Sequence, residues 1–377
     1  MKKALIVTAL AGFVRSFLTH DIELLQEMGF EVYCAANKYH PGAENIDEYF
    51  VEKNVKFLQV DFSSNKPISI ETLKAYKQLK KIVKEQKFEF VHCHTPIAGV
   101  VTRVICKKYR KKGMKVVYTT HGFYFHKNSS TKSWLFFYTI EKLMSKITDA
   151  IITINNEDFC NAKRMECPNV YKINGVGVDI DKFKNIILNR EQYRRSIGVN
   201  NDEIMVLSVG ELSKRKNQKV VLQALGIIKN PKIVFVHCGN AMNKEATTEE
   251  IKKIAKENKV RTIFLGLRQD IPQICHCADI GTISSTREGL GLAGIEMLAS
   301  GLPIVASNVH GIVDYVIEGK NGYLANPYNP SEFAEKIKKI IEEKKIKKEI
   351  VKNTVEKFDK KISFKQMKKI YKKILMN

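Results

Sequence analysis

Residues 284–303, SSTREGLGLAGIEMLASGLP, have the order of a strand end, a glycine loop, a short helix and the start of the next strand. Gly289 and Gly291 allow a ligand to approach the backbone closely, because they carry no side chain. Gly301 suits a left-handed residue that ends a helix, and Pro303 cannot continue that helix. The unpaired amides at the start of such a helix carry partial positive charge. The stretch therefore predicts a phosphate-binding turn between two strands.

Two carboxylates flank this turn. Glu288 precedes the helix, and Glu296 lies about one turn inside it. Carboxylates are strong acceptors for sugar hydroxyls, so a pyrophosphate site between two of them suits a ligand with a sugar at each end. That is the shape of a nucleotide sugar. The alternative is structural, with Glu296 as a surface helix residue and Glu288 as an electrostatic cap of the helix.

The same turn also matches a dinucleotide-binding fingerprint. Residues 289–294, GLGLAG, fit the pattern G-x-G-x-x-G. That fingerprint requires an acidic residue at the end of the next strand. The next expected strand, 303–306, continues into Ser307, Asn308 and Val309, and Asp314 lies beyond its end. An NAD(P)-type oxidoreductase is therefore the alternative enzyme, and it is the less favoured one.

Short apolar strands alternate with amphipathic helices on both sides of the turn, in two series. The expected strands of the first series are residues 3–8, 31–35, 88–93, 115–119 and 150–154. Those of the second are 204–209, 232–237, 262–265, 280–284 and 303–306. Apolar strands separated by helices predict parallel sheets that are covered on both faces. The chain is therefore expected to be an α/β protein of two Rossmann-like, doubly wound domains.

The expected domains are residues 1–178, residues 179–357 and a C-terminal helix, 358–377. The break between the first two is placed in the glycine- and aspartate-containing segment 175–183. Phe364, Met367, Tyr371 and Ile374 recur at three- and four-residue intervals, which predicts one apolar stripe on the last helix. We expect this helix to pack back on the N-terminal domain.

Composition narrows the class of protein and its partners. With 44% hydrophobic and 27% charged residues, the chain has the balance of a soluble globular protein. Its formal net charge of +23 suits an anionic membrane surface, nucleic acid or merely a solvated surface; we expect no nucleic acid. No secretory signal or spanning segment is recognised. The expected location is the cytoplasm, with peripheral contact at the inner face of the plasma membrane, and the eight cysteines are expected to be reduced and mostly buried.

The Glu288–Glu296 spacing resembles the E-x7-E motif of glycosyltransferase family 4, retaining enzymes of the GT-B fold. Five other segments resemble motifs of that family in the same order: 119–123 (TTHGF), 172–179 (KINGVGVD), 207–217 (LSVGELSKRKN), 264–271 (FLGLRQDI) and 319–324 (GKNGYL). The resemblance covers nearly the whole chain and extends to bacterial enzymes of polysaccharide and lipid-linked oligosaccharide synthesis. It implies two Rossmann-like domains that face each other across a donor-binding cleft.

The resemblance also implies roles for individual residues. Three are expected to be catalytic: His121 contacts the sugar near the reacting carbon, Lys216 stabilises the departing diphosphate, and Glu288 binds hydroxyls of the transferred sugar. Glu296 is expected to bind the ribose. The remaining donor-binding residues hold the diphosphate or let a loop approach it, and they are Gly12, Arg215, Gly289, Leu290, Gly291 and Leu292. His94, at the end of an expected strand, is a candidate for the acceptor side.

One position departs from the family pattern. Many members carry arginine directly after the glycine that ends the first strand of the second domain, and this chain has Glu211 there. A carboxylate cannot bind a diphosphate directly. Lys214 or Arg215 would have to compensate, or Glu211 would have to orient one of them.

The implied reaction is a hexosyltransferase-type transfer, with retention, from a nucleotide sugar, expected to be UDP-linked, to a saccharide or lipid-linked saccharide. No cofactor or metal is expected, because a lysine and helix amides neutralise the leaving group. The triplets 92–94 (HCH) and 275–277 (CHC) lack the usual spacing of zinc ligands, and the D-x-D triplet at 179–181 lies at the expected hinge. A non-catalytic nucleotide-sugar-binding protein is a further alternative, but the presence of both His121 and Lys216 favours an enzyme.

An aromatic segment has two interpretations. Trp134, Phe136, Phe137 and Tyr138 follow a loop that contains His126, Lys127 and Lys132. A basic and aromatic segment suits a membrane interface or a lipid-phosphate acceptor. The alternative is ordinary core packing with a fringe of lysines.

Overall fold

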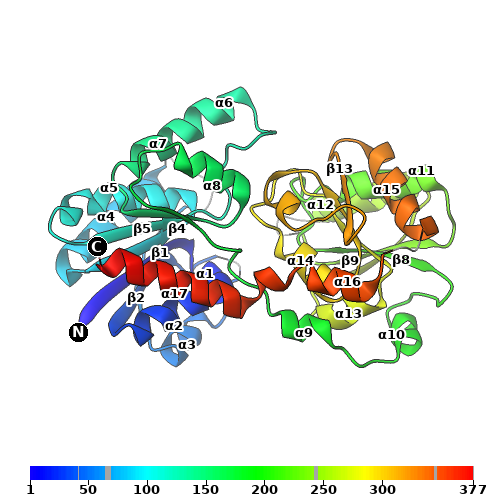
Figure 1. Cartoon of the computed structure of the whole chain (residues 1–377), viewed down its shortest axis with the longest axis horizontal. Helices are drawn as coiled ribbons and strands as arrows, with labels where there is room; N and C mark the ends of the chain where they lie inside the picture. The colour runs from blue at the N-terminus through cyan, green and yellow to red at the C-terminus, as the bar shows by residue number, and fades with distance from the viewer. Residues whose placement is uncertain (41, 64–68, 242–244, 344–345, 377) are drawn as a thin grey trace. The chain divides into compact units, whose positions relative to one another are not determined.

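The computed structural model describes residues 1–40, 42–63, 69–241, 245–343 and 346–376, and the chain in it forms two α/β units (Figure 1). Unit 1 consists of residues 1–177 together with 361–377, and unit 2 consists of residues 178–360. The C-terminal helix, α17 (Lys360–Met376), therefore belongs almost entirely to unit 1. Among the described residues, no helix has both the length and the apolar character needed to cross a membrane.

Unit 1 contains a parallel sheet of seven strands in the order β3-β2-β1-β4-β5-β6-β7. The strands are β1 (Lys2–Leu10), β2 (Phe30–Asn37), β3 (Lys56–Gln59), β4 (Phe90–His94), β5 (Lys115–Thr119), β6 (Ala150–Thr153) and β7 (Val170–Lys172). The strand order reverses between β1 and β4. In open α/β sheets, ligands bind outside the carboxyl ends of the strands at such a reversal.

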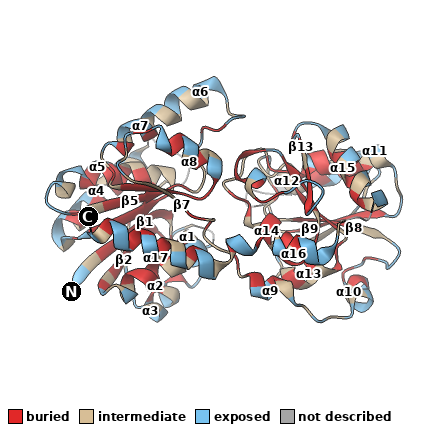
Figure 2. Cartoon of the chain, viewed as in Figure 1, coloured by how far each residue is buried: buried red, intermediate tan, exposed pale blue. Residues whose placement is uncertain are grey.

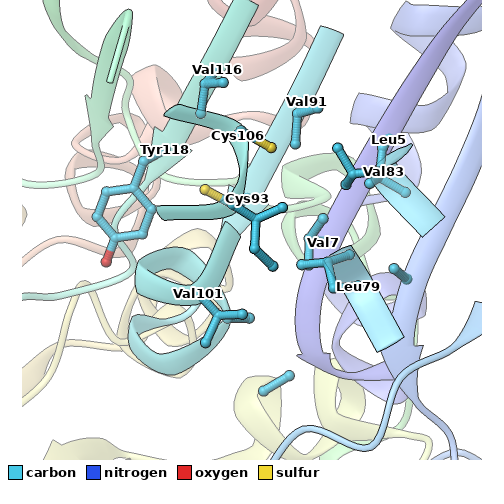
Figure 3. Close-up of a cluster of buried hydrophobic side chains, with 14 of the residues drawn as sticks. Leu5, Val7, Leu79, Val83, Val91, Cys93, Val101, Cys106, Val116 and Tyr118 are labelled. Carbon is cyan, nitrogen blue, oxygen red and sulfur yellow. The ribbon is translucent and has the colours of Figure 1, made fainter. Parts of the chain in front are cut away.

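Strand alternation divides β4 between two packing layers. Val91 and Cys93 point to the core formed with α4 (Ile70–Gln86) and α5 (Pro96–Arg110), which Figure 3 shows in close-up. Phe90, His92 and His94 point to the opposite face, where Tyr371 of α17 packs on the Phe90 ring at 5.2 Å between centroids. The C-terminal helix therefore covers the face of the sheet that carries the two histidines.

The other helices of unit 1 are shorter. They are α1 (Ala11–Phe17), α2 (Thr19–Glu27), α3 (Ile46–Glu52), α6 (Thr131–Ser133), the π-helical turn η1 (Trp134–Tyr138), α7 (Thr139–Ser145) and α8 (Asn156–Lys163). The sequence predicts one amphipathic segment over residues 13–28. The structure instead breaks it at Leu18, whose backbone angles of −118° and 7° are not helical, so α1 and α2 are separate.

Unit 2 contains a parallel sheet of six strands in the order β10-β9-β8-β11-β12-β13. The strands are β8 (Ile204–Val209), β9 (Ile233–Cys238), β10 (Arg261–Gly266), β11 (Ile280–Ile283), β12 (Ile304–Ser307) and β13 (Gly322–Ala325). The order reverses between β8 and β11. The helices are α9 (Ile180–Lys184), α10 (Arg190–Ser196), α11 (Gln218–Ile228), α12 (Glu245–Glu257), α13 (Ile271–Cys277), α14 (Leu292–Ala299), α15 (Pro330–Glu343) and α16 (Lys348–Asn353), with the 3₁₀ turns η2 (His310–Asp314) and η3 (Glu356–Phe358).

The two predicted series of parallel strands are confirmed, and Figure 2 shows the strands buried beneath helices whose outer faces are exposed. Three strands were not predicted: β3, β7 and β13, each of which lies at the edge of its sheet. Residues 319–324, one of the segments that resemble family motifs, contain the start of β13. All eight cysteines are free thiols and six of them are buried, as expected.

Candidate functional site

The glycine turn of unit 2 has the predicted form. Gly291 precedes α14 with φ of 78°, and within the described residues no side chain caps that helix. A Cβ atom at Gly291 would lie 2.9 Å from Cγ of Glu288, so both the backbone angle and the space require glycine. Gly301, with φ of 79°, follows the last turn. The start of α14 therefore has no side-chain cap among the described residues, although the Gly294 amide donates to the Gly291 carbonyl at 2.9 Å, and an uncapped helix start suits an anion.

The third glycine of the dinucleotide-like pattern has a packing role. A Cβ atom at Gly294 would lie 2.4 Å from the hydroxyl oxygen of Tyr315, so that tyrosine packs directly on α14. Asp314 lies in η2, after β12 has ended at Ser307. The acid that a dinucleotide site needs at the strand end is therefore missing from the described part of this unit.

Glu288 is the centre of a cluster of charges beside the turn. Its Oε2 accepts hydrogen bonds from Lys216 Nζ at 2.7 Å, from Arg215 at 3.0 Å and from the Ser285 hydroxyl at 3.1 Å. The Glu288 side chain is only 15% exposed. Burial by itself would raise its pKa, but the charges of Lys216 and Arg215 outweigh burial and hold the pKa below its usual value. Glu288 is therefore an ionised carboxylate that holds two cations.

The backbone brings these residues together at the reversal of strand order in unit 2. Lys216 follows β8 and Glu288 follows β11, and these two strands are neighbours in the sheet. The loops are joined by hydrogen bonds from the Thr286 amide to the Arg215 carbonyl, at 2.8 Å, and from the Ser284 hydroxyl to the Lys216 carbonyl, at 2.8 Å. The predicted residues Lys216, Arg215 and Glu288 thus form one cluster at the carboxyl ends of the strands, where α/β folds bind ligands.

Glu211, at the position where an arginine is usual, lies beside this cluster. Its carboxylate is 3.8 Å from the guanidinium of Arg215. Lys214 is exposed. Of the two basic residues that could compensate for Glu211, Arg215 is therefore the one that lies between Glu211 and Glu288.

Glu296 differs from Glu288. It is half-buried on α14, and no hydrogen-bond donor or cation within the described residues pairs with its carboxylate. Burial raises its pKa, and the positive charge of Lys182 on α9 opposes that rise only partly. A half-buried, unpaired carboxylate near a helix N-terminus is well suited to accept hydrogen bonds from ligand hydroxyls.

In unit 1, the structure brings His94 and His121 together. His94 Nδ1 lies 3.1 Å from His121 Nε2, and the His121 ring packs edge-on against Phe13 at 4.8 Å. Burial lowers the pKa of His121 to about 4 and that of His94 well below its ordinary value. Nε2 of His94 is buried without a hydrogen-bond partner among the described residues. This pair is therefore neutral at physiological pH.

A chain of buried hydrogen bonds connects the histidines to the C-terminal helix. Tyr371 donates from its hydroxyl to Asp21 at 2.8 Å, and the same oxygen lies 2.6 Å from Nδ1 of His92. His92 Nε2 lies 2.7 Å from the Thr119 hydroxyl, and the His92 ring packs against that of His94 at 4.0 Å between centroids, tilted by 41°. Sequence reasoning placed Tyr371 only on an apolar helical stripe and gave no role to Asp21 or to the Thr119 hydroxyl, because no local motif marks a contact between residues 21, 92 and 371.

Three side chains of unit 1 lie close enough together to be compared with a metal site. Asp21, His92 and His94 offer ligand atoms within 4.8 Å of one another. However, Asp21 Oδ1 and both nitrogens of His92 already have hydroxyl partners, so that among the described histidine nitrogens of this group only His94 Nε2 is open. This donor set fits a hydrogen-bond network better than a metal centre, and the absence of a metal stays a prediction.

The other two metal-like triplets are also engaged in structure. Residues 275–277 lie in helix α13 and not in a strand, and His276 Nε2 is 2.7 Å from the Phe183 carbonyl oxygen. Asp179 accepts a hydrogen bond from the Lys182 amide and thereby caps α9. Neither triplet therefore presents a ready set of ligands.

Gly12 and the loop residues have packing roles of their own. A Cβ atom at Gly12 would lie 2.3 Å from the carbonyl oxygen of Gly42, so this contact alone requires glycine there. Leu290 is buried, and Gly311 packs against the carbonyl of Gly289. These contacts fix the shape of both loops, and the donor-binding roles of Gly12, Gly289, Leu290 and Leu292 stay predictions.

Two family models match this chain, one in each unit. Residues 5–155 match the family model described as glycosyl transferase 4-like, and residues 189–357 match that of glycosyl transferases group 1. A protein of Bacillus subtilis strain 168, described as putative glycosyltransferase EpsD, is 30% identical over 90% of this chain and 87% of its own length. An Escherichia coli protein, described as UDP-Gal:alpha-D-GlcNAc-diphosphoundecaprenol alpha-1,3-galactosyltransferase, is 27% identical over 89% of this chain and 86% of its own length.

Solved structures share the fold at low sequence identity. Anabaena HepE, solved in complex with UDP and glucose, aligns with a TM-score of 0.79 over 99% of this chain and 100% of its own, at 19% identity. WaaG, described as a glycosyltransferase involved in lipopolysaccharide biosynthesis, aligns with a TM-score of 0.71 over 97% and 99%, at 15% identity. The expected GT-B fold class is confirmed, and none of these relatives supports the alternative of a dinucleotide-binding oxidoreductase. With matched models over both units and a 30% identical relative along nearly its whole length, the chain belongs to the group 1 glycosyltransferases, with a family 4-like first unit.

Proposed function

We propose that this glycosyltransferase moves a hexosyl group from a uridine diphosphate sugar to a hydroxyl of a lipid-linked saccharide, with retention of the anomeric configuration. The observation that carries the donor half is the Lys216–Glu288 ion pair beside the uncapped start of α14. HepE, which shares the fold, has been solved with UDP and with UDP-glucose, which supports a uridine diphosphate donor.

The cluster of unit 2 supplies what the leaving group needs. Cleavage of the glycosidic bond leaves negative charge on the nucleotide diphosphate, and fixed positive groups at that point lower the barrier. Glu288 holds Lys216 and Arg215 beside the first amides of α14. We assign to Lys216 the stabilisation of the departing diphosphate, and to Arg215 and the amides of residues 289–292 its binding.

The two acids have separate tasks in this proposal. Within the described residues, the hydrogen bonds of the Glu288 side chain all go to Oε2, which leaves Oε1 for a hydroxyl of the transferred sugar. Glu296, which has no cation bound to it, accepts from the ribose hydroxyls. The different surroundings of the two carboxylates support this division, because an ion-paired acid is held in place while an unpaired one is available to a neutral ligand group.

Unit 1 contributes His121 to the transferred sugar and presents the acceptor, with His94 on the acceptor side. Since burial keeps both imidazoles neutral, they donate and accept hydrogen bonds without adding charge. No side chain is assigned as nucleophile; the departing phosphate helps to deprotonate the acceptor hydroxyl, which attacks from the same face. We expect neither metal nor cofactor, because Lys216 and the helix amides supply the positive charge.

Two observations support the proposed acceptor: the name of a relative and the net charge of the chain. The name of the Escherichia coli relative specifies a diphosphoundecaprenol-linked sugar as its acceptor. The net charge of +23 favours an anionic lipid surface. We therefore propose a lipid-linked saccharide acceptor and peripheral contact with a membrane that contains anionic lipid.

The test is a donor panel with one acceptor. Purified protein is given UDP-glucose, UDP-galactose, UDP-N-acetylglucosamine and the matching GDP and ADP sugars, together with N-acetylglucosamine linked through diphosphate to a polyprenol. We expect nucleotide release with at least one UDP sugar, retention at the anomeric carbon by NMR, and loss of turnover in His121→Ala. Release of nucleotide from none of the donors, or a product of inverted configuration, would contradict the proposal.

A further inference from the structure

Unit 1 contains an apolar cavity that the reaction described above does not use. Its volume is about 480 Å³. Aliphatic and aromatic side chains from α5, the loop 122–125 and the η1–α7 segment form most of its wall, among them Val100, Val101, Phe123, Phe125, Phe136 and Phe137. Val101 and Tyr118, which also lines the cavity, belong to the core cluster shown in Figure 3. A cavity of this size and character suits a ligand body that is itself apolar.

The cavity adjoins the loops that carry the candidate residues of unit 1. Ala9, Thr95 and Gly122 belong to its lining. Thr95 directly follows His94, and Gly122 directly follows His121. The Ala9 amide donates to the Thr95 hydroxyl at 3.1 Å, which fixes two of these loops together. A ligand in the cavity would therefore have its end close to the histidine pair.

Exposed apolar side chains surround the same segments. Leu73 is 65% exposed beside the lining residue Thr72, and Leu135 and Leu143 are 70% and 53% exposed on either side of lining residues 136, 137 and 140. Exposed apolar groups gathered around a cavity mark a binding surface more often than isolated ones do. The π-helical turn η1 in this segment is itself a feature that is frequent at functional sites.

The segments around the cavity carry more than half of the net positive charge of the chain. Residues 70–146 contain 17 Lys and Arg but only four Asp and Glu, a net +13 out of +23. The one acid in the lining, Glu141, is neutralised by a bidentate pair with Arg103 at 2.8 and 3.1 Å. The surface thus combines an uncharged, apolar cavity with cationic surroundings, which suits an apolar chain attached to an anionic head.

We propose that this cavity binds the hydrocarbon chain of a lipid phosphate or diphosphate, the carrier of the acceptor saccharide. The role of that lipid as an acceptor rests on the proposed function, whereas the binding of its chain does not require transfer. The chain lies among Val100, Phe125 and Phe137, and its phosphate lies toward the lysine-rich surface and the histidine loops.

Trp134 makes the binding directly measurable. It is the one tryptophan of the chain, and its ring lies 5.2 Å from that of Phe125, which lines the cavity. The full-length protein is titrated with monomeric dodecyl phosphate, octyl phosphate and inorganic phosphate while Trp134 fluorescence is recorded. We expect a saturable change with dodecyl phosphate, affinity at least about tenfold weaker for octyl phosphate, and no change with inorganic phosphate.

Two variants on one helix separate the cavity from the surface. Val100→Phe fills the cavity. The control is Val104→Phe: Val104 lies one turn further along α5, is 42% exposed in the parent protein and does not line the cavity. We expect Val100→Phe to weaken dodecyl phosphate at least about tenfold with UDP binding and thermal midpoint unchanged, and Val104→Phe to bind as the parent does. If the thermal midpoint of Val100→Phe falls below that of the parent, Val101→Leu is used in its place, because it adds less volume to the cavity.

Three outcomes overturn the inference: equal affinity for octyl and dodecyl phosphate, unchanged affinity in the cavity-filling variant, or binding only to phosphatidylglycerol vesicles regardless of that variant. The last would indicate a membrane surface in place of a chain-binding cavity. Chain binding without sugar transfer would instead count against the proposed function and leave this inference standing.

Discussion

The candidate residues of the two units differ in their electrostatics. In unit 2, Glu288 holds Lys216 and Arg215 in a cluster of full charges beside a helix N-terminus. In unit 1, His94 and His121 form a buried pair that burial keeps neutral. A departing diphosphate needs fixed positive charge, whereas an acceptor hydroxyl and a sugar ring need only hydrogen bonds. We infer from this difference that the cluster of unit 2 binds the diphosphate of the donor, while the histidine pair of unit 1 meets the reacting sugar and the acceptor hydroxyl with neutral groups.

The largest effect is expected from removal of the charge in unit 2. Lys216→Ala should lower the rate of sugar transfer roughly 100- to 1,000-fold, the range observed when a preorganised group that stabilises transition-state charge is lost. Steady-state transfer with the best donor measures this. Lys214→Ala, an exposed neighbour, is the control and should change the rate less than about threefold. An equal loss of transfer rate in both variants would contradict the role assigned to Lys216.

A smaller effect is expected at the unpaired acid of unit 2. Glu296→Ala should weaken nucleotide binding by about 1.5–3 kcal/mol, the scale of hydrogen bonds to a charged group. Because burial raises the pKa of Glu296, the affinity of the parent should also begin to fall on acidification at a higher pH than an exposed glutamate would give. Calorimetry across a pH series measures both effects. Exposed Glu349→Ala is the control, and a Glu296 variant that binds like it would contradict the ribose assignment.

In unit 1, the change with the clearest expected effect on stability is Tyr371→Phe. Loss of the hydroxyl leaves Asp21 Oδ1 and His92 Nδ1 without their buried partner, at a cost of about 1–3 kcal/mol. Trp134 lies in unit 1, so urea unfolding followed by tryptophan fluorescence reports on this unit. Exposed Tyr328→Phe should leave the curve unchanged. An unchanged curve in Tyr371→Phe would mean that the hydrogen-bond chain contributes no stability.

A further prediction concerns the pH dependence of that same unit. Burial raises the pKa of Asp21 to about 7, with the Tyr371 hydrogen bond opposing, and lowers the pKa of His92 to about 3. Folded Asp21 holds its proton more tightly than the unfolded chain does, so its contribution to stability falls as pH rises from about 4 to 7. Folded His92 holds its proton less tightly, so its contribution rises with pH between about 3 and 6.5.

Asp21→Asn removes the falling contribution and leaves the rising one. The urea midpoint of the variant relative to the parent should therefore increase from pH 5 to pH 7 and stay level above that. Unfolding curves at four pH values, recorded through Trp134, measure the difference. A constant difference between variant and parent over this range would show that Asp21 does not change its protonation on unfolding.

The strands that could not be predicted share one physical property. β3 and β7 are the edges of the first sheet and β13 is an edge of the second, and each has three or four residues. Prediction relied on continuous apolar runs, which arise where a strand is buried on both faces. Every residue of β7 is half-buried, and its sequence, VYK, carries no such run. The central strands, in contrast, were found with boundaries close to those observed.

In the candidate site, too, the features that belong to a local sequence motif were predicted, and those that depend on tertiary contacts were not. The glycine turn, Lys216 and Glu288 could be found because each belongs to a local motif, and a strand reversal brings neighbouring loops together. The pairing of Lys216 with Glu288, and the contrast between Glu288 and Glu296, depend on burial that a motif does not specify. The contact of Tyr371 with Asp21 and His92 joins three distant parts of the chain through α17, and one sequence contains no signal for it.

Calorimetric titration with UDP and with uridine tests most directly whether the turn before α14 binds a diphosphate. We expect UDP to bind at least about tenfold more tightly than uridine, because charged hydrogen bonds to the diphosphate each contribute about 1.5–3 kcal/mol. Lys216→Ala should reduce that difference but not abolish it, because Arg215 and the amides of residues 289–292 remain, and uridine affinity should stay the same. Equal affinity for UDP and uridine in the parent protein would contradict the account.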